Sequence, residues 1–213
     1  MELFGHNRKA YEAVKNEFSE GVPRTCVVHP TGTGKSYIAL RLIEDNPEKP
    51  ILYVTSLYIN LTTFMGEVDK LNLPQNHVEF SLYSSLEKCN GHYDYIILDE
   101  FHRAGAQDWS KGLSLVLNDN PGAFVLGLSA TPIRYLDSFR NMAEELFGGH
   151  IASQITLKDA LVSGLLPMPH YRSAVYSFED EFAKAERLLK KRYDQKAERL
   201  LSMAKQNLEL ADV

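Results

Sequence analysis

Five short apolar runs punctuate the first 130 residues of the chain, and each has the composition of a buried β-strand. They are rich in β-branched and aromatic residues, and the middles of several are continuously apolar, as in strands covered on both faces. They occupy residues 25–29, 50–56, 79–83, 94–100 and 124–130. Because segments with helical spacing or turn residues lie between them, the pattern predicts an α/β domain of three layers with a mostly parallel sheet.

Apolar residues at steps of three and four predict the helices between and after these strands. Proline or glycine follows several of these segments, where such residues end a helix. Thr156 and Asp159 have the spacing of a capping box at the start of the last short helix. The helices are expected at residues 35–44, 57–71, 139–147 and 156–164.

The last part of the chain has a different pattern. From residue 179 to residue 210, apolar residues step by three or four through a dense field of charged side chains. This predicts one long C-terminal helix, about 45 Å in length at 1.5 Å per residue. Two interpretations stay open: a solvated amphipathic helix folded back on the domain, or a helix used between domains or between copies of the chain. The change of pattern separates a domain at 1–170 from a C-terminal segment at 171–213.

The composition adds limits on partners and compartment. With 213 residues, 44% hydrophobic content and a formal net charge of −5, the chain has a globular composition, and a nucleic-acid contact must come from a local patch. Cys26 and Cys89 have no metal-ligand spacing, which favours free thiols in a reducing compartment. No stretch approaches 18 consecutive apolar residues, and the N-terminus lacks an apolar signal core. We therefore expect a cytoplasmic protein without a membrane partner.

Residues 29–36 read HPTGTGKS and follow the first predicted strand. Consecutive backbone N–H groups that open onto a helix N-terminus grip phosphates, so the string predicts an ATP-binding loop. In such a loop Lys35 reaches the β and γ phosphates and the Ser36 hydroxyl holds Mg²⁺. The alternative is an ordinary glycine-rich turn from strand to helix. The predicted ATP contacts in the loop are Thr31, Gly32, Thr33, Gly34, Lys35 and Ser36.

The first position of this loop departs from the usual pattern, because His29 stands where a glycine or another small residue is typical. This position only turns the chain out of the strand. Histidine is one of the non-glycine residues enriched at positive φ. We therefore expect His29 to make the turn at positive φ, with Pro30 stiffening the exit.

The run DYIILDEFHRAG places Asp99 and Glu100 at the end of an apolar strand. The carboxyl ends of parallel strands form the edge where open α/β domains bind ligands. Asp99 is therefore a candidate Mg²⁺ ligand, and Glu100 a candidate base for the attacking water. Taken alone, such an acidic pair is more often the start of a polar loop.

The run VLGLSATP ends the fifth predicted strand with Ser129, Ala130 and Thr131. Small hydroxyl residues at this place can hydrogen-bond to the acidic turn and to backbone carbonyls. By themselves they are equally typical of an ordinary strand-ending turn.

In this order, TGTGKS, DEFH and SAT resemble the first RecA-like motor domain of superfamily 2 helicases and translocases, the DEAD/DEAH-box-like group that includes type III restriction motor subunits. The resemblance covers about residues 1–170. It implies a RecA-like P-loop fold and the hydrolysis of ATP, with Mg²⁺, to remodel or move on nucleic acid, with DNA favoured over RNA. It also implies that the SAT strand separates the acidic strand from the loop strand.

The resemblance assigns roles to individual residues. Lys35 and Ser36 match the phosphate and magnesium residues, and Asp99 and Glu100 the metal and water-activating residues. His102 matches the histidine that senses the state of the nucleotide. Ser129 and Thr131 match the motif that couples ATP turnover to work on nucleic acid.

Weaker matches leave alternatives open. Asn7 stands three residues before Ala10, where relatives place an adenine-reading glutamine, but it could equally be the N-cap of a helix that begins near Arg8. Other polar residues fall where relatives touch the nucleic-acid backbone, and each could equally be a polar strand end. They are Thr55, Ser56, Tyr83 to Ser85, and Arg134.

In the family, a second RecA-like domain supplies an arginine that stabilises charge on the transferred phosphoryl group, and no second loop or sheet follows residue 170. We therefore expect an N-terminal half-motor that is completed by a missing part of the chain or by another subunit, and that is weak or inactive alone. The segment at 171–213, with its long amphipathic helix, would then be the connector. The alternative is a nucleotide-gated binding module without turnover in isolation. A small-molecule P-loop kinase is disfavoured, because DEFH and SAT have no place in it.

Overall fold

The computed structural model describes residues 1–105, 107–135 and 139–170. The chain divides into two units, Met1–Met168 and Pro169–Val213, and every helix and strand described below lies in the first. The predicted connector at 171–213, with its long helix at 179–210, lies outside the described residues.

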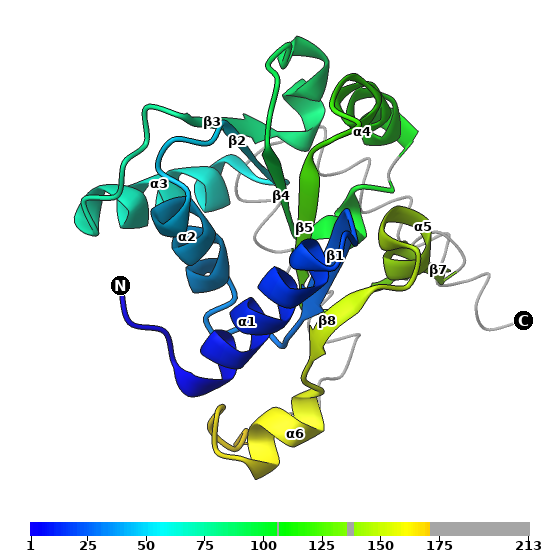
Figure 1. The fold of residues 1–213 in the computed structure, drawn as a ribbon. Coiled ribbons are helices and arrows are strands. Elements are labelled where there is room, and N and C mark those ends of the chain that lie inside the picture. The colour runs from blue at the N-terminus through cyan, green and yellow to red at the C-terminus, as the bar shows by residue number, and fades with distance from the viewer. Residues whose placement is uncertain (106, 136–138, 171–213) are drawn as a thin grey trace, which may run out of the picture. The chain divides into compact units, whose positions relative to one another are not determined.

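The domain is built on a six-stranded sheet in which every neighbouring pair of strands is parallel (Figure 1). This confirms the predicted mostly parallel α/β fold. β5 lies between β4 and β1, which is the order expected from the resemblance. Across the sheet the strands are β3 (Val78–Leu82), β2 (Ile51–Thr55), β4 (Tyr95–Asp99), β5 (Phe124–Ser129), β1 (Arg24–Val28) and β8 (Ile151–Gln154).

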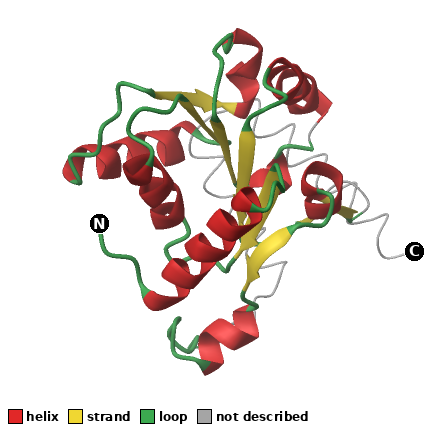
Figure 2. Ribbon diagram, in the orientation of Figure 1, coloured by secondary structure: helices red, strands yellow, loops and turns green. Residues whose placement is uncertain are grey.

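The inner strands are largely apolar because both faces of the sheet are covered (Figure 2). In β2, for example, the Tyr53 side chain enters one core, whereas Leu52 and Val54 enter the other. The first core is completed by α1 (Gly5–Ser19), α2 (Ser36–Asp45) and α3 (Tyr58–Lys70). The second is completed by α4 (Gln107–Asp119), α5 (Met142–Phe147) and the 3-10 helices η1 (Tyr83–Lys88) and η2 (Phe101–Arg103). The predicted three-layer architecture is confirmed.

The predicted boundaries agree closely with the structure where the sequence pattern is strong. β1 to β5 match the five predicted strands to within one residue at each end, as do α2 and α3. The capping box is present at α6 (Leu157–Val162), where Thr156 accepts from the Asp159 backbone N–H and the Asp159 side chain accepts from Thr156.

Two predicted helix starts were wrong. The third predicted helix begins at Met142 instead of residue 139, because Asn141 caps it and Phe139 adopts a left-handed φ of 60°. α1 begins at Gly5, so Asn7 lies inside the helix and the interpretation of Asn7 as an N-cap is wrong.

Several elements were not expected. They are β8 at one sheet edge, α4, η1, and the short antiparallel pair of β6 (Ile133–Arg134) and β7 (Arg140–Asn141). Within the described part of the chain β8 pairs with β1 alone and is partly buried, so it lacks the continuous apolar run of a strand such as β2. Within the residues that the structure describes, no helix has the length and apolar character needed to cross a bilayer.

Candidate nucleotide-binding site

The predicted phosphate-binding loop connects β1 to α2 at the carboxyl edge of the sheet. Gly32 and Gly34 have φ values of 88° and 78°, a conformation that glycine adopts without strain. The Thr33 hydroxyl donates to the Pro30 carbonyl oxygen at 2.8 Å, which closes the loop on itself. This turn delivers the backbone of Lys35 and Ser36 to the start of α2, where free N–H groups favour an anion.

Helix α1 holds the loop through contacts with its backbone carbonyl oxygens. Asn7 is fully buried, and its Nδ2 donates to the carbonyl oxygens of Thr33 and Gly34 at 3.0 and 3.1 Å. A ring nitrogen of His6, Nε2, lies 2.7 Å from the Thr33 carbonyl oxygen. Two loop carbonyls are therefore engaged by α1, which fixes the loop geometry before any ligand binds.

His29 does not make the predicted turn at positive φ. Among the described non-glycine residues, positive φ occurs only at Asn72, Glu100 and Phe139. Instead, the His29 backbone N–H donates to the Ser129 carbonyl oxygen at 3.0 Å, which continues the pairing of β1 with β5. Nε2 of its buried ring lies 2.9 Å from the Ser153 hydroxyl of β8. A glycine is not needed at this position because the chain stays extended there.

Burial lowers the pKa of His29 to about 4, and electrostatic interactions with His6 and Lys35 act in the same direction. The folded protein therefore keeps His29 neutral at a pH where the unfolded chain, with its ordinary pKa of 6.5, binds a proton. As the pH falls from 6.5 towards 4, this difference lowers the free energy of unfolding, by about 2 to 3 kcal/mol in total.

A His29→Gln variant tests this contribution, because glutamine keeps hydrogen-bonding capacity but does not titrate in this range. The wild type is expected to lose stability relative to the variant between pH 7 and pH 4.5, as measured by urea unfolding at each pH. The comparison must be relative, because burial raises the pKa of Asp99 to about 6 and so gives a contribution of the opposite sign. A stability difference that is constant with pH would contradict the assignment.

Lys35 is buried, and its Nζ donates to the Pro30 carbonyl oxygen at 3.3 Å. Burial lowers the pKa of its ammonium group, although the carboxylates of Glu100 and Asp99 act in the opposite direction. A neutral carbonyl is a weak partner for a buried cation compared with a phosphate oxygen. The position of Lys35 therefore suits a ligand that carries negative charge.

The predicted residues of two motifs meet at one cavity of about 470 Å³. Its lining includes loop residues, the acidic pair that follows β4, and side chains of α3. Of the predicted ATP contacts, Thr33 and Asn7 do not line it, because their side chains donate to carbonyl oxygens of the loop instead. The lining residues are Thr31, Gly32, Gly34, Lys35, Ser36, Tyr37, Tyr53, Asn60, Thr63, Phe64, Glu67, Asp99 and Glu100.

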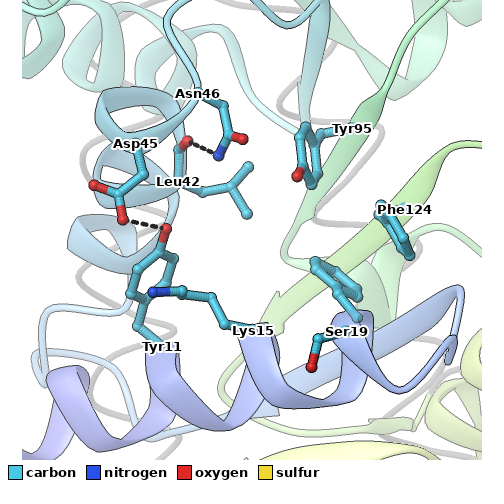
Figure 3. Close-up of a pocket in the computed structure, with 9 residues that line it drawn as sticks. Tyr11, Lys15, Ser19, Leu42, Asp45, Asn46, Tyr95 and Phe124 are labelled. Atoms are coloured by element: carbon cyan, nitrogen blue, oxygen red, sulfur yellow. Dashed lines mark hydrogen bonds between the residues drawn. The ribbon is translucent and has the colours of Figure 1, made fainter.

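A second cavity, of about 540 Å³, contains none of the predicted site residues. It is bordered by α1, the end of α2 and the rings of Tyr95 and Phe124 (Figure 3). Its polar groups are engaged within the protein: the Tyr11 hydroxyl donates to Asp45 at 2.8 Å, and Asn46 Nδ2 donates to the Leu42 carbonyl oxygen at 2.8 Å. Although this cavity is larger, its charged groups are paired within the protein, Lys15 with Glu12 and Asp45 with Arg41.

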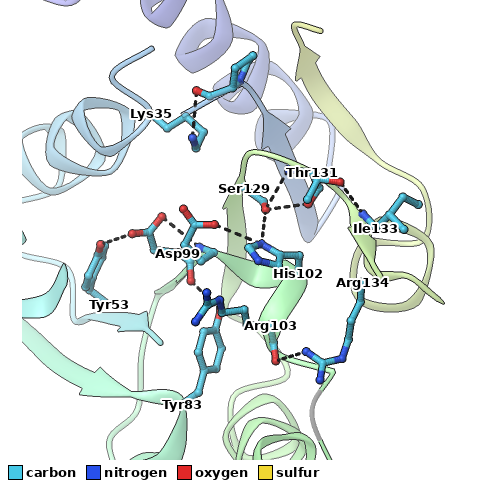
Figure 4. Close-up of polar contacts among 12 residues, drawn as sticks. Lys35, Tyr53, Tyr83, Asp99, His102, Arg103, Ser129, Thr131, Ile133 and Arg134 are labelled. Atoms are coloured by element: carbon cyan, nitrogen blue, oxygen red, sulfur yellow. Dashed lines mark hydrogen bonds and ion pairs between the residues drawn. The ribbon is translucent and has the colours of Figure 1, made fainter. Parts of the chain in front are cut away.

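Asp99 is the last residue of β4, and each oxygen of its carboxylate accepts a hydrogen bond (Figure 4). The Tyr53 hydroxyl donates to Oδ2 at 2.8 Å, and the Glu100 backbone N–H donates to Oδ1 at 3.1 Å. Burial raises the pKa of Asp99 to about 6, even though both hydrogen bonds and Lys35 favour the ionised form. A buried carboxylate that faces only one ammonium group is suited to gaining a further cation.

Glu100 turns the chain away from the strand in a left-handed conformation, with φ 53° and ψ 44°. This region is sparsely populated for residues other than glycine, and such conformations concentrate at functional sites. The side chain lies beside His102, with Oε2 3.2 Å from Nδ1. The hydrogen bond from His102 lowers the pKa of Glu100, so its carboxylate is ionised and able to accept a proton near neutral pH.

His102 joins the acidic turn to the SAT segment (Figure 4), because its Nδ1 also lies 2.8 Å from the Ser129 hydroxyl. The Ser129 hydroxyl donates to the Thr131 carbonyl oxygen at 2.7 Å, so its proton is not available to His102. We therefore assign the proton to Nδ1 of His102, which donates to Ser129 and Glu100. Thr131 in turn accepts from the Ile133 backbone N–H through its hydroxyl at 3.1 Å. The three coupling candidates thus form one chain of contacts.

The residues predicted to contact nucleic acid differ in their exposure to solvent. Tyr83 is buried, and its hydroxyl donates to the Asp99 carbonyl oxygen at 3.2 Å, so its side chain does not lie at the surface. Thr55 is also buried, whereas Ser56 and Arg134 are partly exposed. Arg134 donates to the Arg103 carbonyl oxygen at 3.4 Å, beside the acidic turn.

The sequence did not identify three residues that shape the site. Tyr53 lies within an apolar strand, and only the register of β2 beside β4 brings its hydroxyl to Asp99. His6 and Ser153 contact the loop and His29 from elements that are distant along the chain. No local pattern of sequence signals such long-range contacts.

A family model described as "Type III restriction enzyme, res subunit" matches residues 1–57 and 52–134. The chain is 29% identical to "Putative helicase 22" of Sulfolobus islandicus filamentous virus (isolate Iceland/Hveragerdi), and the match covers 49% of this chain and 24% of the relative. The chain therefore spans about a quarter of this relative's length.

Solved structures share the fold. The Type ISP restriction-modification enzyme LlaGI, in complex with a DNA substrate mimic, has a TM-score of 0.61 at 20% identity over 76% of this chain and 18% of that chain. For the related enzyme LlaBIII bound to DNA, the TM-score is 0.57 at 19% identity over 77% and 16%. The Pyrococcus furiosus Hef helicase domain has a TM-score of 0.57 at 15% identity over 83% and 44%.

Proposed function

Because the chain belongs to the family of the type III restriction enzyme res subunit, we propose that residues 1–170 are the ATP-binding half of a motor that remodels or moves on nucleic acid. The predicted resemblance to a superfamily 2 helicase-like RecA motor domain is confirmed by the family match and the structural neighbours. Membership of such a family implies ATP use, usually with Mg²⁺. The finer roles below are our proposals.

The observation that carries the proposal is the convergence of Lys35, Ser36, Asp99 and Glu100 on one cavity. A hydroxyl and a carboxylate are oxygen ligands of the kind that Mg²⁺ prefers, and among the described residues Lys35 is the one cation that acts on the buried Asp99, so the donor set fits this ion. Ser36 and Asp99 would hold Mg²⁺, which supplies charge neutralisation at the phosphates. Lys35 and the loop N–H groups would bind the phosphates themselves.

Glu100 is the proposed base for the attacking water, because it is ionised and lines the cavity. His102, Ser129 and Thr131 are the proposed coupling residues. Their contacts connect the base to the short β6–β7 pair, where Arg134 lies. An adenine contact of Asn7 stays a proposal, although Asn7 does not line the cavity in this structure. It would use the buried Oδ1, which has no hydrogen-bond partner among the described residues, because Nδ2 is engaged by the loop.

The partners follow from the same proposal. We propose nucleic acid as the substrate, with DNA favoured over RNA, and two structural neighbours are described with DNA. A second RecA-like domain, on the same or another chain, is proposed to complete the site, with 171–213 as the connector. The free thiols of Cys26 and Cys89 fit a reducing compartment such as the cytoplasm.

A second candidate, a nucleotide-gated binding module without turnover in isolation, rests on the charges of the cavity. Among the described lining residues, Lys35 is the one cation. Charge that develops on a transferred phosphoryl group is therefore poorly neutralised by the described residues alone. The two candidates differ in turnover but share ATP binding.

Binding of Mg·ATP to the chain, measured by calorimetry, tests the proposal. A Lys35→Ala variant is expected to bind about 10- to 100-fold more weakly, because a charge-assisted hydrogen bond to phosphate is lost. Lys15→Ala is the matched control, since Lys15 lies on α1 at the other cavity. The affinity of this variant for ATP should equal that of the wild type. Equal weakening in both variants, or no binding by the wild type, would contradict the proposed site.

A further inference from the structure

We propose that Tyr53 is a positioning residue that orients the Asp99 carboxylate for Mg²⁺ and sets the affinity of the site for this ion. The inference rests on the proposed function, since Asp99 must be a metal ligand for it to hold. The resemblance assigns no role to Tyr53, and the strand that carries it was predicted only from its apolar character.

The hydrogen bond to Asp99 is specific. Tyr53 pairs with Ile97 in the register of β2 and β4, which places its hydroxyl 2.8 Å from Oδ2 of Asp99. The other oxygen, Oδ1, accepts from the Glu100 backbone N–H at 3.1 Å. With one donor on each oxygen, the carboxylate cannot rotate without breaking a hydrogen bond.

The Tyr53 ring is held as firmly as its hydroxyl. It is 1% exposed and stacks on Phe64 of α3 with ring centroids 3.8 Å apart and planes 8° apart. Phe80 of β3 packs against it at 6.2 Å in an edge-on arrangement. Because the ring has no room to swing, the direction of the O–H bond towards Asp99 is set by packing.

Packing alone does not explain a tyrosine at this position. A phenylalanine would fill the same space, and a buried hydroxyl destabilises a fold unless it is hydrogen-bonded. Among the described residues, the partner of this hydroxyl is the Asp99 carboxylate, which faces Lys35 across the cavity. Residues that hydrogen-bond to metal ligands orient them, and their loss typically lowers metal affinity about 10- to 100-fold.

Two other tyrosines provide matched controls. Tyr83 is equally buried and donates to the carbonyl oxygen of Asp99, not to its carboxylate, at 3.2 Å. Tyr11 donates to the carboxylate of Asp45 at 2.8 Å, away from the nucleotide cavity. A Tyr→Phe change at either position removes a similar hydroxyl while leaving the Asp99 carboxylate held.

The experiment is the binding of a fluorescent ATP analogue to the full chain as a function of Mg²⁺ concentration, with a parallel titration in EDTA. For Tyr53→Phe we expect the Mg²⁺ concentration at half-saturation to rise about 10-fold or more. The affinity for the analogue in EDTA should equal that of the wild type. Tyr83→Phe and Tyr11→Phe should both keep the wild-type Mg²⁺ dependence. In an Asp99→Asn background, adding Tyr53→Phe should have no further effect.

Each other result has a definite meaning. An unchanged Mg²⁺ dependence in Tyr53→Phe overturns the positioning role, and so does an equal loss of binding with and without Mg²⁺, which would assign the residue to the nucleotide cavity itself. If the wild type binds the analogue in no condition, the proposed function fails instead. Should Tyr53→Phe not fold, Phe64→Leu, which keeps the hydroxyl but removes the stacked ring, must raise the Mg²⁺ requirement selectively for the inference to stand.

Discussion

A Glu100→Gln variant is expected to bind Mg·ATP with wild-type affinity and to hydrolyse it about 10²- to 10⁴-fold more slowly, the range that a positioned general base contributes. Glutamine has nearly the same shape as glutamate but cannot accept a proton from the attacking water. The His102 hydrogen bond keeps the pKa of Glu100 below its ordinary value, so the wild-type side chain is ionised at neutral pH. Steady-state phosphate release, measured beside calorimetric binding, separates the two effects.

Glu67→Gln is the matched control for this prediction. Glu67 lines the same cavity from α3, and its carboxylate accepts from Lys70 and Tyr37 on the solvent side. Its replacement removes the same charge from the same cavity without touching the acidic turn. A similar loss of turnover in both variants would show that only the total charge matters, and it would remove Glu100 from the role of base.

The sequence predicted the central sheet because its strands are buried on both faces. β2 shows this clearly: all five of its residues are buried, so its run is continuously apolar and stands out from its surroundings. β8 was missed because it has one neighbour in the sheet and half-exposed residues, which leaves no comparable pattern. The start of α5 was misplaced because Phe139 has helical spacing but a left-handed backbone, and the local cap at Asn141 decides the boundary.

The candidate site was predictable where its chemistry is local. The loop and the acidic pair each come from one short string, and both sit at the carboxyl ends of parallel strands, so their meeting followed from topology. The positive φ of His29 and the N-cap interpretation of Asn7 were wrong, because the contacts of both residues are made far along the chain, by His29 with Ser153 and by Asn7 with the carbonyls of Thr33 and Gly34. The role of Tyr53 was not predicted for the same reason, since its hydrogen-bond partner lies on a neighbouring strand.

Turnover by this chain alone is expected to be slow, and addition of a second RecA-like domain that carries an arginine should raise it by about 10³- to 10⁵-fold. The cause is the charge in the cavity. Among its described lining residues Lys35 is the one cation, and burial already lowers the pKa of that ammonium group. An arginine delivered to the γ phosphate would supply the missing positive charge in a site that excludes water.

The measurement is ATP hydrolysis by the chain alone and by the chain joined to a second RecA-like domain, each with single-stranded DNA, duplex DNA and RNA. Replacing the supplied arginine by alanine should return turnover to the level of the chain alone, while ATP binding stays intact. If the chain alone hydrolyses ATP quickly, the dependence of the specific rate on protein concentration decides between two causes. A rate that rises with concentration means that copies of the chain complete each other's sites. A constant rate means that Lys35 and Mg²⁺ suffice, and it would refute the need for an added arginine.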